Sequence, residues 1–160
     1  MIGDIQLLRN GSFGVVGSRK HNVAASSTTI KAGEPVGKVL GNASVIPLPT
    51  NAPSQGTSWM VGIAATTSTN TATAAGSVEV IPLVDSQVFL IKPLDSTLWD
   101  TQTEYDALVG DRVELDLTTS TYTIQAADTQ YGGCVIQPLD ITKYPGKVAF
   151  SVREVVNYLA

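Results

Sequence analysis

The feature that most limits how this chain can fold is a series of short runs rich in β-branched residues, each bounded by Gly, Pro or a Ser/Thr cluster. β-branched side chains fit a pleated sheet, and turn residues at such short intervals leave little room for long helices. We expect strands in nine runs: residues 36–40, 44–48, 59–64, 77–81, 87–91, 112–117, 121–126, 134–137 and 147–155. Short strands with frequent turns predict an all-β protein, built as a sandwich or a barrel.

Composition agrees with a sheet protein whose surface is covered by hydroxyl groups. Thr and Ser number 18 and 13 among 160 residues, whereas charged residues make up 15%, against about 25% in typical domains. This length suffices for one domain with a buried core. Apolar and polar residues alternate at Val113, Leu115 and Leu117, so one face of that strand should be buried.

One short helix is expected. Thr101 and Glu104 have the spacing of a capping box, in which each side chain hydrogen-bonds the backbone N–H of the other residue. The helix should run about two turns and end at Gly110, because glycine tolerates the left-handed conformation that closes a helix. Residues 66–76 (TTSTNTATAAG) have low complexity and are predicted to form an exposed loop.

The first 29 residues lack the signals of a finished domain. Residues 17–29 are small and polar without a period, and cannot bury enough apolar area to offset the entropy lost on ordering. We therefore divide the chain into an extended N-terminal arm, residues 1–29, and a β-domain, residues 30–160, that should fold without it. The arm is either a flexible tail or a segment that orders on a partner. Its candidate contacts are apolar and basic: Ile5, Leu7, Leu8, Arg9, Phe13, Arg19 and Lys20.

Charge is distributed unevenly along the chain. Residues 1–40 hold five bases and two acids, whereas residues 95–116 hold seven acids and one base. Two interpretations stay open: two solvated patches, or a basic N-terminal segment that docks on an acidic neighbour. The net charge of −4 argues against a nucleic-acid partner. No apolar run reaches about 18 residues and the start does not resemble a signal peptide, so we expect a soluble, uncleaved protein without a membrane partner.

The residues that carry catalysis elsewhere are poorly placed here. His21 is the only histidine and lies in the predicted arm, where no base is held in position. Cys134 begins an apolar run and is expected to be a small buried residue. Glu114 and Asp116 alternate with core positions and should face solvent. With one Cys and one His we predict no zinc site, no cofactor and no enzyme activity, while an irregular calcium site stays open.

Two other classes of function remain. Trp99, in the acidic segment before the helix, is the candidate exposed contact, because an aromatic side chain on a β scaffold can stack on a sugar. It would suit a β-sandwich module that binds a glycan or receptor. A hydrolase with paired acids among Asp100, Glu104 and Glu114 would instead need a cleft holding carboxyls of raised pKa.

Several segments in a fixed order resemble one family. They are IKAGEPV (30–36), VIP (45–47), VGIA (61–64) and AGSVEV (75–80), with weaker similarity at VGDRV (109–113) and in residues 147–155. In this order they resemble the small decoration, or cement, proteins of bacteriophage capsids. The resemblance covers about residues 30–91; the segment 49–58 and the helix near Tyr105 depart from it.

The resemblance implies a small β-barrel or β-tulip domain with an extended N-terminal arm. It also implies a homotrimer on the outer surface of the virion, with the arm running across subunits of the major capsid protein. The function implied is to stabilise contacts between those subunits. Many weak contacts made at once would act together as a clamp.

Overall fold

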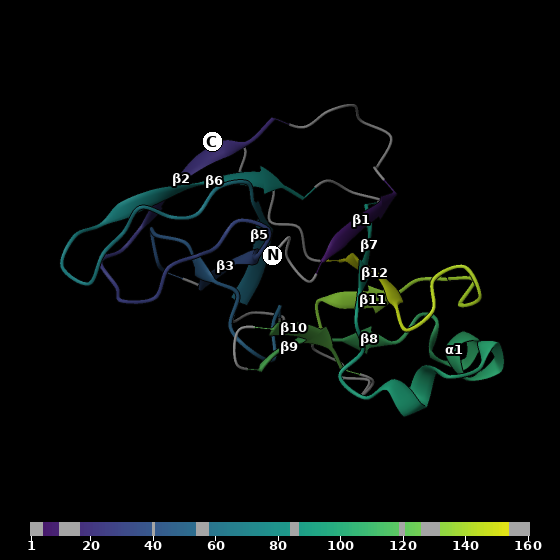
Figure 1. The fold of residues 1–160 in the computed structure, drawn as a ribbon. Coiled ribbons are helices and arrows are strands. Elements are labelled where there is room, and N and C mark those ends of the chain that lie inside the picture. Colours follow the sequence, from purple (N-terminus) through teal and green to yellow (C-terminus); the bar gives the residue numbers. More distant parts are fainter. Residues whose placement is uncertain are drawn as a thin grey trace.

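The computed structural model describes residues 5–9, 17–39, 41–53, 58–83, 87–118, 121–125 and 132–153, without the side chains of Leu7, Arg9, Ser96 and Leu98. These residues form strands β1–β12, one α-helix and one short 3-10 helix (Figure 1). The strands make two five-stranded sheets and one hairpin. The all-β prediction with one short α-helix is therefore confirmed.

The first sheet has the strand order β1-β7-β12-β11-β8, and all of its pairs are antiparallel. Its strands are β1 (Gln6–Arg9), β7 (Val88–Ile91), β8 (Arg112–Val113), β11 (Cys134–Ile136) and β12 (Val148–Val152). The hairpin of β9 (Leu115–Thr118) and β10 (Thr121–Ile124) lies beside this sheet.

The second sheet has the order β2-β6-β5-β3-β4. Its strands are β2 (Arg19–Val23), β3 (Pro35–Val39), β4 (Ile46–Pro47), β5 (Ser58–Ala64) and β6 (Gly76–Pro82). The sheet curls until its two edges meet at one isolated parallel bridge, between Val23 and Val45, where Val45 N donates to Asn22 O at 2.9 Å. A single bridge is not a paired strand, so the predicted barrel stays open in the described residues.

The buried hydrophobic residues form two cores. The larger core lies between the sheets and under the β9–β10 hairpin, and its largest members are Tyr105, Tyr122 and Phe150. The smaller core fills the curl of the second sheet with aliphatic side chains, mostly valines: Val23, Ile30, Val36, Val45, Ala64, Val78 and Val80. Strand β5 serves both cores because its pairing with β3 shifts between Val36 and Gly37.

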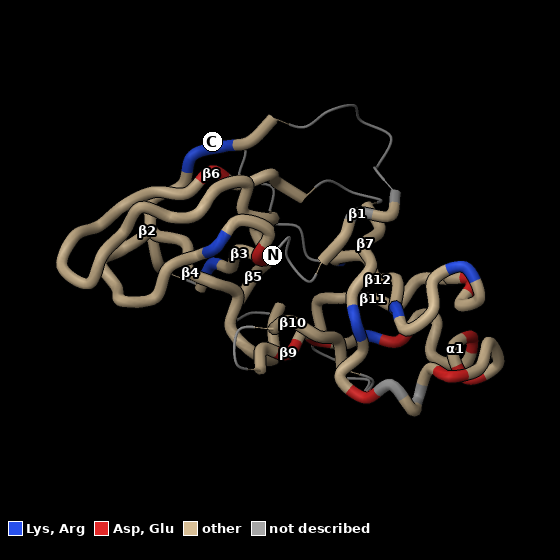
Figure 2. The backbone as a smooth tube through the Cα atoms, in the orientation of Figure 1, with Lys and Arg blue, Asp and Glu red and all other residues tan. Residues whose placement is uncertain are grey.

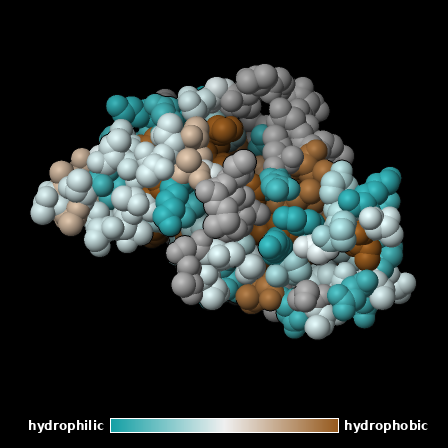
Figure 3. All heavy atoms as spheres, in the orientation of Figure 1, coloured by the Kyte–Doolittle hydropathy of each residue, from teal (hydrophilic) through white to brown (hydrophobic). Residues whose placement is uncertain are grey.

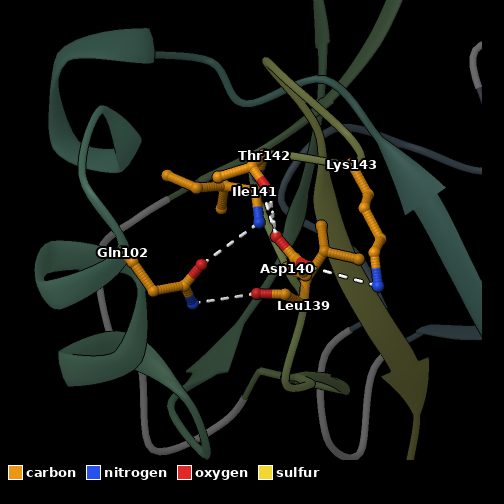
Figure 4. Close-up of polar contacts among 6 residues, drawn as sticks. All are labelled: Gln102, Leu139, Asp140, Ile141, Thr142 and Lys143. Atoms are coloured by element: carbon orange, nitrogen blue, oxygen red, sulfur yellow. Dashed lines mark hydrogen bonds and ion pairs between the residues drawn. The ribbon is translucent and has the colours of Figure 1, made fainter.

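Helix α1 (Gln102–Leu108) follows the 3-10 helix η1 (Ser96–Trp99) and carries the predicted capping box. Thr101 accepts from Glu104 N at 3.2 Å, and Glu104 accepts from Thr101 N at 3.1 Å. Gly110 has φ of +96°, as a helix-ending glycine should. The Gln102 amide fastens α1 to the loop before β12: it donates to Leu139 O at 2.9 Å and accepts from Ile141 N at 3.2 Å (Figure 4).

The prediction of an N-terminal arm separate from the domain is wrong for the described residues. Strand β1 pairs with β7 and strand β2 with β6, so residues 6–9 and 19–23 are strands of the two sheets. Pairing with β7 and β6 satisfies the backbone groups of these residues whether or not their side chains form a periodic apolar face. A boundary at Ile30 therefore cuts through both sheets.

The low-complexity segment 66–76 is mostly the exposed loop that its sequence predicts, but its buried Ser68 and Asn70 hold part of this N-terminal region in place. Asn70 is 4% exposed, and its amide donates to Ser26 O and Thr28 O, each at 3.0 Å. Its side-chain oxygen accepts from Ser68 Oγ at 2.6 Å, and that hydroxyl in turn accepts from Ile30 N at 2.9 Å. We name Ser68 and Asn70 the polar staple. Its side-chain hydrogen bonds hold residues 26–30, which belong to no strand.

Candidate interaction surface

The structure separates the predicted contact residues into three groups. Ile5 is 6% exposed in the larger core, and Leu8 is half-buried against it. The side chains of Leu7 and Arg9, and all of Phe13, lie outside the described residues. Arg19 and Lys20 are exposed at the start of β2, which is an edge strand of its sheet.

Trp99 is not the exposed contact that its surroundings in the sequence predicted. Its side chain is 6% exposed, and its ring lies 5.6 Å from that of Tyr105 at an interplanar angle of 59°. The 3-10 turn of η1 brings the indole back against the first turn of α1, because this packing buries a large apolar area. An aromatic platform for a sugar is therefore absent at this position.

Tertiary structure gathers basic residues from two strands around the start of β2. His21 lies opposite Val78, and Lys20 lies opposite Glu79, on neighbouring β6. The pKa of His21 is lowered, first by burial and then by the positive charges of Lys38 and Arg19, while Glu79 opposes the shift. Lys38 belongs to β3, so the curl of the sheet has brought it close to β2. The spacing of these residues in the sequence did not predict that Lys38 lies close to β2.

The two halves of the molecule differ in charge (Figure 2). The described residues of 17–83, which contain the second sheet, carry four bases and two acids. The described residues of 87–153, which contain most of the first sheet and α1, carry five bases and eight acids. The sequence predicted this separation along the chain, and the fold preserves it in space because each half keeps its own segment.

Three acidic residues sit in a repeated Asp-x-Thr arrangement. Asp95, Asp116 and Asp140 each accept a hydrogen bond from the Thr hydroxyl two residues later, at 2.7, 2.6 and 2.6 Å. These bonds are the largest cause of a lowered pKa in all three carboxyls. A glycosidase acid needs the opposite shift, since it must hold its proton near neutral pH. The arrangement therefore stabilises the ionised carboxyl and does not fit a proton-donating acid.

Other groups with catalytic or metal-binding potential are isolated. Cys134 is fully buried, and burial raises the pKa of its thiol, with a smaller contribution from the Glu114 charge. A thiol in this state is a weak nucleophile. In the described part of the chain, no group of three or more His, Cys, Asp or Glu side chains is arranged to hold a metal ion. Nor does any helix there have the length and apolar character needed to cross a membrane.

Comparisons with known proteins give no relative from which a site could be transferred. No protein-family model, curated protein or solved structure matches the chain. The candidate interaction surface therefore rests on the described residues: the exposed start of β2 with Arg19 and Lys20, and the nearby Lys38.

Proposed function

We propose that this protein decorates the outer surface of a phage capsid and stabilises contacts between subunits of the major capsid protein. The observation that supports it is where the family-like segments lie. Residues 30–36, 45–47, 61–64 and 75–80 lead into or form β3, β4, β5 and β6. These are neighbouring strands of one curled sheet, since β3 pairs with β4 and β5, and β5 pairs with β6. Segments spread along 50 residues thus contribute to one structural unit.

The exposed basic start of β2 gives this unit a surface that suits an acidic partner. Arg19 and Lys20 lie on an edge strand, beside β6 of the same sheet. In the proposed function the protein works as a homotrimer, and each subunit adds a modest, salt-sensitive contribution. Simultaneous contacts by several copies would resist dissociation of the head more than any single contact does.

The alternative of a glycan- or receptor-binding module loses its main support. It depended on Trp99 as an exposed aromatic side chain, and Trp99 is packed against Tyr105. None of the exposed large hydrophobic side chains among the described residues is a Trp or Phe. We therefore propose one function.

Co-sedimentation tests the proposal. The full chain is mixed with undecorated heads of the virus that encodes it, and we expect it to pellet with the heads at a fixed ratio to the capsid subunit. The substitution Lys20→Glu should weaken this binding about tenfold, whereas Lys92→Glu, an exposed charge change on the other half, should leave it unchanged. A wild-type chain that stays in the supernatant would refute the function itself.

A further inference from the structure

The second sheet closes on itself at a single point. Among the described residues, β2 meets the segment that leads into β4 only at the Val23–Val45 bridge, where Val45 N donates to Asn22 O at 2.9 Å. Strand β4 is two residues long, and it pairs with Val36 and Gly37 of β3. The bridge therefore brings β2 close to β3. We call the line along which β2 meets β4 the seam.

Two basic side chains of β2 lie on the inner face of the curl. Arg19 lies opposite Val80 on β6, and both residues of such a pair lie on one face of a sheet. His21 lies opposite Val78 in the same way. Both valines are buried in the smaller core, so the face of β2 that carries Arg19 and His21 is the inner one. His21 is half-buried, whereas Lys20, on the outer face, is exposed.

Lys38 lies on the inner face of β3, on the other side of the seam, and is half-buried. Val36 of the same strand is buried in the smaller core, and side chains two residues apart lie on one face. The register shift between β3 and β5 does not interrupt this alternation, because the extra residue is Val61 on β5. Figure 3 shows hydrophilic surface over the start of β2 and over β3. Arg19, His21 and Lys38 thus approach the seam from two strands.

The electrostatic environment of His21 agrees with this placement. After the larger effect of burial, Lys38 and Arg19 both lower the pKa of His21, while Glu79 of β6, opposite Lys20 on the outer face, opposes them. Strands β4 and β5 carry no charged residue. The potential at the imidazole is therefore positive, which disfavours protonation of His21 in the protein alone. A bound anion reverses this preference, because a nearby negative charge favours the protonated imidazole.

We propose that Arg19, His21 and Lys38 bind a doubly charged tetrahedral oxyanion, the class of phosphate and sulfate, across the seam. Guanidinium, imidazolium and ammonium groups all donate charge-assisted hydrogen bonds to such an ion, and a guanidinium can bind two of its oxygens at once. The ion would join β2 to β3 beside the single bridge that closes the curl. This inference does not rest on the proposed capsid function, because the ligand is a small ion and the site faces the inside of the curl.

NMR of the imidazole of His21 in the full chain tests the site. His21 is the only histidine in the sequence, so its ring signals report on this position alone. Sulfate is added while chloride keeps the ionic strength constant, and the signals are followed from pH 8 to pH 5. We expect sulfate to shift the ring signals and to raise the pKa of His21. By linkage, sulfate should bind about threefold or more tightly at pH 5 than at pH 8.

Three single substitutions separate a built site from general surface charge. Arg19→Gln and Lys38→Gln should each weaken sulfate binding about threefold or more, because each removes one donor. Lys20→Gln is the matched control: it removes the same charge from the neighbouring position on the outer face of β2 and should change the affinity less than about twofold. Circular dichroism melting checks that each variant is folded, and two different inner-face variants keep the test decisive if one of them is not.

Sulfate that leaves the ring signals and the pKa of His21 unchanged would overturn the inference. A loss of affinity in Lys20→Gln as large as that in Arg19→Gln would also overturn it, because the ion would then respond only to the net charge of the surface. The same titration with inorganic phosphate and with phosphoserine identifies the source of the oxyanion. Binding of both supports a site that also accepts a phosphate group carried by another molecule, and binding of inorganic phosphate alone supports a site for the free ion.

Discussion

The two halves of this protein are stabilised in different ways. The larger core, most of whose side chains come from the first sheet, the hairpin and α1, is filled by bulky side chains, and Phe89 and Phe150 pack with ring centroids 5.6 Å apart. The smaller core inside the second sheet contains mostly valines, and the polar staple completes its edge. Apolar burial dominates the first half, whereas hydrogen bonds from short polar side chains carry a larger share in the second.

This difference explains how a chain rich in Ser and Thr still orders a tightly curled sheet. A small curl has room only for small side chains, which release little free energy on burial. Buried hydrogen bonds from hydroxyl and amide groups add stabilising free energy to that of the buried valines, provided that every polar group in the network has a hydrogen-bond partner. Gly76 allows the close approach that this needs, since a Cβ there would lie 2.7 Å from Asn70 Cα.

Removing residues 1–29 should break both halves and has the largest expected effect. The deletion takes away β1 and β2, buried Ile5 and Val23, and the carbonyl groups that the Asn70 amide binds. We expect a chain that starts at Ile30 to show no cooperative thermal transition by circular dichroism. If it melts at the temperature of the full chain, the N-terminal strands are dispensable and the original boundary was right.

Phe150→Ala should affect the first half strongly. Phe150 is fully buried, and truncation of a core Phe costs about 3–5 kcal/mol because of lost burial and the cavity left behind. Val80→Ala truncates one of the smaller buried side chains that fill the second half and should cost about 2 kcal/mol, because it removes two methyl groups. Chemical denaturation of both variants measures the comparison. Equal losses would contradict the assignment of apolar burial mainly to the first half.

Asn70→Ala should affect the second half through polar contacts alone. It leaves the carbonyls of Ser26 and Thr28 and the Ser68 hydroxyl without this partner, at an expected cost of about 2 kcal/mol in the free energy of unfolding. The exposed Asn42→Ala is its control and should change stability little. Hydrogen exchange should locate the loss in residues 26–30. If the Asn70→Ala chain has the same free energy of unfolding as the wild-type chain, the polar staple does not stabilise the second half.

The smallest effect is expected from alkaline pH, where the buried phenol of Tyr105 in the first half titrates. Burial raises the pKa of Tyr105 to about 12; its hydroxyl donates to Gln137 O and accepts from Ala149 N, each at 2.9 Å. Because this pKa lies above the unfolded value of about 10, the stability that Tyr105 contributes is complete below pH 10 and declines as pH rises toward 12. Tyr105→Phe should lower stability at pH 7 but flatten the alkaline decline. If Tyr105→Phe leaves the dependence of stability on alkaline pH unchanged, a group other than Tyr105 causes the decline.

The sequence by itself determined the local elements of the fold. Each of the nine predicted strand segments overlaps at least one observed strand, and the α-helix begins at the predicted capping box. Leu115 and Val113 are buried while Glu114 and Asp116 are partly exposed, as alternation required. These features depend on residues within a few positions of one another, and side-chain shape, turn chemistry and capping act over that range.

Only the tertiary structure decided which segments pair and which side chains become covered. The hydrogen bonds of β1 and β2 come from strands about 50–85 residues later, so no local pattern revealed them. Trp99 was predicted exposed from its acidic neighbours, but Tyr105 covers it. Lys38 joined Arg19 and His21 through the curl of a sheet. Backbone pairing satisfies any extended segment regardless of its composition, and burial depends on what packs above a residue. Neither the pairing partner nor the burial of a residue can therefore be predicted from its immediate neighbours in the sequence.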